Sequence, residues 1–391
     1  MSNTSLNILY HPSLFLNGQT RPVSDPGSFC AFLNILNIPY KIKQYNPKKD
    51  KNGILYCNFT FSNKANNKLV DFNDFKDLLK IAAGTNIQLL LWQPYESFGH
   101  FNPQFREKWN ANLKILNDVG FAPQRILYVS GDILCKDTSS VNYNNMRRIG
   151  VDAFPFVTAQ RYAKVPLRSI NPNKKTKKFL CLNKLPRVHR SVLYYYLTKY
   201  NLIDSSIVSW TDKYEKLSLD DVKAFTFDDS RIDKVNTLPT IKLDNDIGPN
   251  RGYQDLTWYD NTVFSLVTET TVDENSLFLT EKIYKPIMIG HPFVIWGNPG
   301  TLEYLRSEGY QTFPELFDES YDIEENHAKR LEKIIKICKD TPITEWSDSV
   351  IEKIEHNKKH FSTQWRMKFV NLTQNVVTEL LSYQNNKNHP K

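Results

Sequence analysis

Hydrophobic and polar residues alternate along the first half of the chain in the way that is typical of parallel α/β folds. Short runs of apolar, β-branched or aromatic residues predict strands at residues 6–10, 55–61, 87–92 and 125–130. Between them, longer segments with helical patterning predict helices at residues 27–36, 74–83 and 105–119. Strands and helices that alternate in this order form a parallel sheet with helices on its faces.

The second half of the chain starts this alternation again. Strands are predicted at residues 179–182, 263–268 and 293–296, and helices at residues 188–200, 281–289, 301–308, 323–338 and 348–381. Residues 166–178, rich in proline, asparagine and lysine, are typical of a linker. We therefore predict an α/β protein with two Rossmann-like domains facing a cleft, residues 1–165 and 166–391, and a last helix that packs back on the first domain.

Composition agrees with a folded protein and narrows its class. A length of 391 residues suits two domains, and 40% hydrophobic residues suffice for their cores. The amino-terminal residues lack the features of a signal peptide, and no apolar run is long enough to span a bilayer. The five cysteines are scattered and form no C-x-x-C pair, which indicates reduced thiols and argues against a zinc site. These features predict a cytoplasmic protein without a membrane span.

The basic character of the chain leaves two kinds of partner open. The formal net charge is +8 and the pI is about 9.0. Such an excess suits a nucleic-acid partner, but it equally suits a protein that binds a pyrophosphate and stays soluble. Charge alone therefore does not decide between them.

The segment FLTEKIYKPIMIGHPFVIWG, residues 278–297, contains the first candidate site. Thr280 is a good N-cap, and the helix that follows is predicted to end at Gly290. Lys282 then lies in the first turn, where helix amide groups and a lysine together form an anion site suited to a pyrophosphate. Glu281 is suited to accept hydrogen bonds from ribose or sugar hydroxyls. The alternative interpretation is an ordinary capped, charged helix start.

The segment KFLCLNKLPRVHRSVLYYYL, residues 178–197, contains the second. A predicted strand runs into a loop with Asn183, Lys184 and Arg187, and the helix after it begins close to Arg190. An arginine at this place can hold a phosphate through two parallel hydrogen bonds. A solvated basic loop is the competing interpretation.

Together these segments resemble glycosyltransferase family 10, the α-1,3-fucosyltransferase-like family. The family has a glutamate-bearing strand, then aromatic-x-T-E-K, a helix, and an apolar strand that ends in W-G or L-G. Here the pattern reads Glu269, Phe278, Thr280-Glu281-Lys282 and V-I-W-G at residues 294–297. The arginine-led helix RSVLYYYL also resembles the family, with Asn183 in the family's asparagine position.

The resemblance implies a GT-B-like fold and a role for each matched residue. Arg190 and Lys282 would neutralise the diphosphate, Glu281 would hold the ribose or nearby hydroxyls, and Glu269 would face the donor sugar. Glu269 lies two residues farther from the T-E-K sequence than the family's glutamate does. A literal E-N-S at Glu274 is too close to Thr280, so we favour Glu269, which ends a strand. The implied donor is a nucleotide sugar, GDP-fucose or similar, and no cofactor is required.

A weaker match lies in the first half of the chain. The sequence WQPYESFGH, residues 92–100, is similar to the family's W-x-x-F-E-S-x-x-H, whose glutamate is the supposed catalytic base. Glu96 follows a predicted parallel strand, and ligand sites of α/β folds lie beyond the carboxyl ends of such strands. Inverting transfer needs one base to deprotonate the acceptor hydroxyl, with His100 as a neighbour or second candidate. A surface-loop glutamate is the alternative.

One triplet in the second half of the chain resembles a metal site. Asp244-Asn245-Asp246 is a D-x-D triplet, the manganese signature of the other main glycosyltransferase fold, but its glycine- and proline-rich surroundings favour a turn.

We therefore predict a metal-independent, inverting transfer to a glycan. The alternatives are transfer to a hydroxylated base of DNA, and a carbohydrate- or nucleic-acid-binding protein without turnover.

Overall fold

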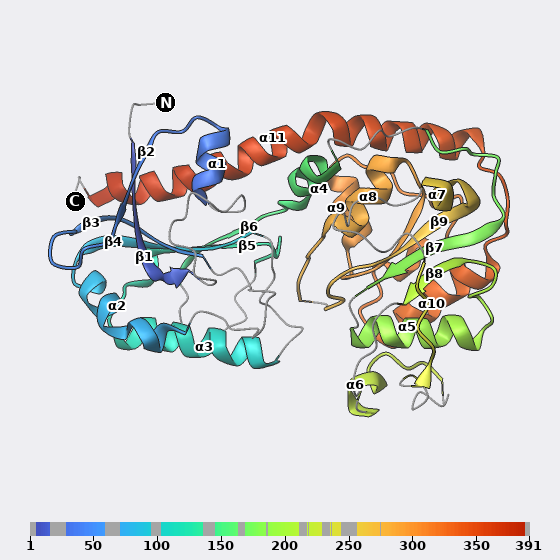
Figure 1. Ribbon diagram of the computed structural model, residues 1–391, viewed down its shortest axis with the longest axis horizontal. Coiled ribbons are helices and arrows are strands. Elements are labelled where there is room, and N and C mark those ends of the chain that lie inside the picture. Colours follow the sequence, from blue (N-terminus) through green and yellow to red (C-terminus); the bar gives the residue numbers. More distant parts are fainter. Residues whose placement is uncertain are drawn as a thin grey trace. The chain divides into compact units, whose positions relative to one another are not determined.

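The chain forms two compact units, Met1–Ala153 with Arg366–Lys391, and Phe154–Trp365 (Figure 1). The computed structural model describes residues 5–15, 29–58, 71–94, 103–135, 145–162, 169–184, 187–210, 217, 219–228, 235, 237–243, 256–273 and 275–387. Each unit is built around its own sheet, and the strand pairs within both sheets are parallel.

The first unit contains a six-stranded sheet in the order β2-β1-β3-β4-β5-β6. Its strands are β1 (Leu6–Phe15), β2 (Tyr40–Gln44), β3 (Asn52–Asn58), β4 (Asn86–Gln93), β5 (Ile126–Ser130) and β6 (Arg147–Gly150). The central strand β4 is the apolar run NIQLLLWQ, and every residue from Ile87 to Gln93 is buried. A strand that is covered on both faces needs such a continuous apolar run, because neither side of it meets water.

Helices cover both faces of this sheet. Figure 1 shows α2 (Lys76–Ala83) and α3 (Pro103–Asp118) along one face, and α1 (Phe29–Ile35) and the last part of α11 (Asp348–Lys387) along the other. The Phe32 ring lies 5.1 Å from Trp92 and 4.6 Å from Phe369 of α11. The buried Gln88 side chain of β4 donates to the carbonyl of Leu380, 3.0 Å away. The end of α11 therefore belongs to the core of the first unit.

The second unit contains a four-stranded sheet in the order β10-β9-β7-β8. The strands are β7 (Lys177–Asn183), β8 (Ile207–Trp210), β9 (Thr262–Thr268) and β10 (Phe293–Trp296). Every residue of β9 and of β10 is buried. Along the chain, β8 is added on one side of β7 and β9 on the other, so the direction of winding reverses between β7 and β9.

The helices of the second unit are α4 (Phe154–Tyr162), α5 (Val188–Lys199), α6 (Leu219–Lys223), α7 (Leu256–Asn261), α8 (Glu281–Ile289), α9 (Thr301–Ser307) and α10 (His327–Asp340). Figure 1 shows α5 and α10 on one side of the sheet and α7 and α8 on the other. Short 3₁₀ helices occur at Phe72–Phe75, Pro123–Arg125 and Glu319–Tyr321. Within the described ranges, no helix is both long and apolar enough to cross a membrane.

These two parallel sheets with their helices confirm the predicted α/β fold class and its two Rossmann-like units. The limits of α8 and β10 are those that the sequence predicts, as are the Thr280 cap and the left-handed Gly290 at the end of α8, with φ of 88°. The division into units places α4 with the second sheet and the end of α11 with the first.

Candidate functional site

The carboxyl ends of β7 and β9 meet where the winding of the second sheet reverses. Open α/β sheets bind ligands outside the carboxyl ends of their strands at such a switch point. Here β7 ends at Asn183 and β9 ends at Thr268, directly before Glu269. The helices that follow, α5 and α8, begin at Val188 and Glu281. The donor-binding residues predicted from the sequence therefore lie along one edge of one sheet.

Thr280 connects three parts of this edge through a single hydroxyl group. The hydroxyl donates to Glu269 Oε2 at 2.6 Å. It also accepts from the Lys282 amide at 3.3 Å, as an N-cap does, and from Lys282 Nζ at 2.9 Å. The helix start, the strand end and the lysine side chain are thus held in one arrangement.

Lys282 extends over this cap toward the loop that follows β9. Its ammonium lies 3.2 Å from Thr270 Oγ1 and 3.5 Å from the Glu281 carboxylate. The Lys282 side chain is 28% exposed and that of Glu281 is 24% exposed. The ammonium therefore lies partly exposed at the amino end of α8, next to Glu281, where the helix dipole adds to the attraction for an anion.

Glu269 is buried, with 1% of its surface exposed, and its carboxylate is satisfied by the protein itself. Besides the Thr280 hydroxyl, the Thr280 amide donates to Oε1 at 3.1 Å and the Thr270 amide donates to Oε2 at 3.3 Å. Burial raises the pKa of the Glu269 carboxyl, and the Lys282 charge and the bonds from Thr280 oppose that rise. A side chain at Gly297 would come within 3.3 Å of the Glu269 side chain, which explains why a glycine follows β10.

Arg190 and His189 fix the peptide of Glu269 from the other side. Arg190 Nη2 donates to the carbonyls of Thr268 and Glu269, at 3.0 and 2.8 Å. His189 Nε2 lies 3.0 Å from the same Glu269 carbonyl and donates to it, because a carbonyl can only accept. Arg190 is 4% exposed, and burial together with the charge of Arg187 lowers its pKa to about 10. The buried Arg190 side chain thus lies against the carboxyl end of β9, and Arg187 is close to it.

Asn183 and Arg187 flank the start of α5. The buried Asn183 side chain accepts a hydrogen bond from the Thr268 hydroxyl and so connects the ends of β7 and β9. Arg187 is partly exposed at the N-cap of α5, and no side chain caps this helix. Arg187 therefore directly precedes the first amide groups of α5 at this end of the helix.

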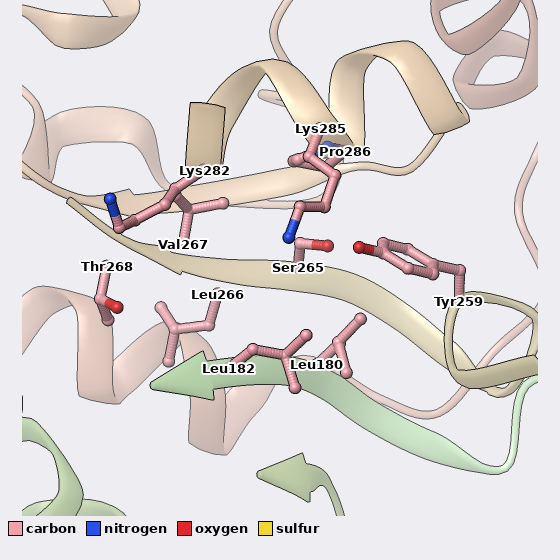
Figure 2. Close-up of a pocket in the computed structure, with 10 residues that line it drawn as sticks. All are labelled: Leu180, Leu182, Tyr259, Ser265, Leu266, Val267, Thr268, Lys282, Lys285 and Pro286. Carbon is pink, nitrogen blue, oxygen red and sulfur yellow. The ribbon is translucent and has the colours of Figure 1, made fainter. Parts of the chain in front are cut away.

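A pocket runs from this edge along the sheet, beneath α8 (Figure 2). The space within it is about 360 Å³ with its open mouth included. Thr268 and Lys282 lie at one end of the pocket and Tyr259 at the other, with Lys285 above Ser265 (Figure 2). Lys285 was not predicted as a site residue, although it follows Lys282 by three residues and so shares its helix face.

Several predicted residues lie outside the described residues. These are Glu96 and His100, and also Glu274 and the triplet at 244–246. Strand β4 ends at Gln93, three residues before Glu96. In the described part of the chain, no group of three or more histidine, cysteine, aspartate or glutamate side chains is arranged to hold a metal ion.

Two residues that were not predicted from the sequence contact Glu269 or Lys282 in this site. Thr270 supplies an amide to Glu269 and a hydroxyl to Lys282, and His189 supports the Glu269 peptide. Each is adjacent in sequence to a predicted residue, Glu269 or Arg190, and that adjacency was the available signal.

Comparison with known proteins gives low similarity throughout. No protein-family model and no curated protein matches the sequence. Among solved structures, an α1,3-fucosyltransferase matches with a TM-score of 0.39 and 11% identity, over 94% of this chain and 92% of that chain. A T4 phage BGT mutant in complex with UDP-glucose matches with a TM-score of 0.38 and 10% identity, over 96% and 99%. T4 phage BGT in complex with UDP and Mn²⁺ matches with a TM-score of 0.38 and 9% identity, over 96% and 99%.

Proposed function

We propose that the chain is a glycosyltransferase that moves a sugar from a nucleoside-diphosphate donor to an acceptor hydroxyl. The observation that carries the proposal is the position of Lys282, Arg187 and Arg190 around the switch point between β7 and β9. Cations and two helix amino ends at such an edge suit a diphosphate. The resemblance of the segments around Arg190 and Lys282 to the fucosyltransferase-like pattern supports a nucleotide sugar, GDP-fucose or a similar donor.

On the donor side, the protein must stabilise the leaving diphosphate. When the bond between the sugar C1 and the phosphate oxygen breaks, its electron pair leaves with the nucleoside diphosphate. The Lys282 ammonium, with two neutral hydroxyls among its three near neighbours, is placed to meet that charge. We assign Arg187 the same task at α5 and Glu281 the ribose or sugar hydroxyls, while Arg190 holds the edge together.

On the acceptor side, we propose that Glu96 is the general base and His100 its neighbour. The Glu96 carboxylate takes the proton of the acceptor hydroxyl, and the oxygen forms the new bond to C1 on the face opposite the leaving group. The configuration at C1 is then inverted. The position of Glu96 after β4, at the carboxyl end of a parallel strand, supports this assignment.

The acceptor that the resemblance implies is a glycan, and one observation favours an alternative. The net charge of +8 with a pI of about 9.0 suits a DNA acceptor that carries a hydroxylated base. A protein that binds carbohydrate or nucleic acid without turnover is the remaining alternative, although such a protein has no need of a carboxylate base.

The test is a thermal-shift panel of nucleoside diphosphates and nucleotide sugars on the full chain. A ligand at 100 times its Kd adds about 2.7 kcal/mol to the stability of the native state, so the true donor nucleotide should raise the Tm clearly. Lys336→Ala is the matched control for Lys282→Ala, because Lys336 is an exposed helix lysine paired with Asp340 on α10. If no nucleotide raises the Tm, or if Lys282→Ala responds as the parent does, the donor site is wrong.

Turnover then separates the acceptors. The nucleotide sugar that gives the largest shift is incubated with a glycan or with duplex DNA that carries a hydroxylated base, and the released nucleoside diphosphate is measured. Release that depends on the glycan supports the proposal. Release that depends on DNA supports the alternative acceptor, and binding without any transfer supports a binding protein.

A further inference from the structure

A cluster of aromatic rings lies beside the carboxyl end of β10, next to the proposed donor site. Phe225, which follows α6, stacks on His327 at the start of α10 with ring centroids 5.1 Å apart and planes at 20°. The Phe225 ring also lies 6.2 Å from Trp296 in an edge-to-face arrangement and 6.4 Å from His189. The cluster brings together rings from four separate segments of the second unit.

The inner part of this cluster is rigidly held. Trp296 Nε1 donates to the His189 carbonyl at 3.2 Å. The buried Arg330 guanidinium lies 5.0 Å from the Trp296 ring centroid and donates to the carbonyl of Val272 at 2.7 Å. Arg330 Nη2 also lies 3.3 Å from His327 Nδ1. Because a guanidinium only donates, Nδ1 of His327 accepts, and the imidazole is neutral with its proton on Nε2.

The outer part of the cluster is partly exposed. Trp296 and His189 are buried, with 0% and 5% of their surfaces exposed, whereas Phe225 and His327 are both partly exposed. Two stacked, nearly parallel rings with solvent-accessible surface can extend the stack by one further flat ring. Aromatic side chains bind nucleobases in this way, largely independently of which base it is.

The cluster and the proposed phosphate site share one peptide group. The Glu269 carbonyl accepts from His189 Nε2 of the ring cluster and from Arg190 Nη2 of the phosphate edge. After burial, the charges of Arg190 and Arg187 also contribute to lowering the pKa of His189, so these groups lie close to one another. A ligand with a flat ring at one end and a diphosphate at the other therefore matches this edge.

We infer that Phe225 and His327 bind the base of the donor nucleotide by stacking. The inference rests on the proposed function, because it takes the diphosphate to bind at Lys282 and Arg187. It adds that the second unit binds the base of the donor nucleotide through an aromatic surface. Phe225 is then a binding residue, and Trp296 and Arg330 are positioning residues.

The experiment compares binding of GDP, UDP and inorganic pyrophosphate to the full chain by calorimetry. Phe225→Ala should weaken binding of the nucleotides by about 10- to 100-fold and leave binding of pyrophosphate unchanged. Phe225→Leu retains an apolar side chain but has no π face, so it should lose nucleotide affinity similarly. Phe225→Tyr should retain nucleotide affinity.

Phe227→Ala is the matched control. Phe227 lies two residues away, is also partly exposed, and stacks on Tyr196 at 4.1 Å instead of joining the cluster. This variant should bind the nucleotides as the parent does. The inference is overturned if Phe225→Leu binds GDP and UDP with parental affinity, or if Phe227→Ala loses as much affinity as Phe225→Ala.

The pyrophosphate arm separates failure of the inference from failure of the proposed function. If the parent binds pyrophosphate as tightly as the nucleotides, the bases contribute nothing; the inference then fails while the phosphate site stands. If the parent binds none of the three ligands, the proposed donor site itself is wrong, and the inference falls with it.

Discussion

Replacing Thr280 by valine tests the central arrangement of the candidate site. Valine has nearly the same shape as threonine but lacks the hydroxyl group. The substitution removes the donor at 2.6 Å from Glu269 Oε2 and the acceptor for the Lys282 amide and ammonium. It therefore removes the cap of α8 and one of the three hydrogen bonds to the buried Glu269 carboxylate, and it leaves those from the Thr280 and Thr270 amides.

The magnitude follows from these contacts. Loss of an N-cap costs about 1 kcal/mol, and loss of a hydrogen bond to a buried charged group costs about 1.5 to 3 kcal/mol. We expect the free energy of unfolding of the second unit to fall by about 2.5 to 4 kcal/mol. In a unit of this size, that corresponds to a fall in Tm of about 5 to 15 °C.

The pH dependence separates the two contributions. Burial raises the folded-state pKa of Glu269 above its ordinary value of 4.5, so the parent loses stability as pH rises from that value to the folded-state pKa. The Thr280 bonds oppose this rise, and removing the hydroxyl raises the folded-state pKa further. Thr280→Val should then continue to lose stability at pH values above the folded-state pKa that Glu269 has in the parent. Near pH 4 the carboxyl is protonated in the unfolded and folded states, and only the cap loss of about 1 kcal/mol remains.

The assay is urea unfolding of the parent, Thr280→Val and Thr280→Ser at about pH 4 and about pH 8. Thr280→Ser keeps the hydroxyl and should stay close to the parent at both pH values. Equal destabilisation of Thr280→Val at the two pH values would refute the role of the Glu269 carboxylate. A serine variant as unstable as the valine variant would refute the role of the hydroxyl.

The remaining predictions concern the proposed reaction. Lys282→Ala should weaken binding of the donor nucleotide by about 10- to 100-fold, measured by calorimetry, while Lys336→Ala should leave it unchanged. Arg190→Lys should lower both the Tm and donor affinity, because the lysine ammonium is one atom closer to the backbone than the Nη2 atom that contacts both carbonyls; full activity in this variant would contradict the arrangement. Glu96→Gln should lower kcat by about two to four orders of magnitude with donor affinity nearly unchanged; parental turnover there, and its loss in His100→Ala, would make the histidine the base. Transfer should persist after chelation of divalent ions, and a strict manganese requirement in the transfer assay would count against this site.

The parts of the fold that the sequence predicts well are those with a strong and self-contained pattern. Helix α8 has a capping threonine, an apolar face and a terminal glycine, and β10 is an uninterrupted apolar run, so both limits were predicted correctly. Strands β2, β6 and β8 were not predicted. Strands β2 and β6 lie at the two edges of the first sheet, and edge strands commonly carry charged side chains. The sequence of β2 is YKIKQ, and β6 begins with two arginines, so neither shows the apolar pattern of an inner strand.

The predicted site likewise combines residues that have a local sequence signal with contacts that have none. Motif spacing identified Thr280, Lys282 and Arg190, because each is tied to a helix start. The partners of those residues depend on which strands are neighbours, and that information is not local in the sequence. The contact of Arg190 with the Glu269 peptide, 79 residues away, requires the β7–β9 pairing. Stacking of Phe225 on His327 likewise joins segments that no motif connects.

The chemistry of Arg190 shows why the pairing matters for function. From the sequence, this arginine is a phosphate ligand; in the fold, its Nη2 already contacts two carbonyls and it is 4% exposed. A buried guanidinium with fixed partners contributes its field to a nearby anion without moving, whereas a mobile one must first be ordered. Arg187 and Lys282, which are partly exposed, then supply the direct contacts. Donor affinity should therefore depend on all three cations, but only Arg190 should also determine the stability of the second unit.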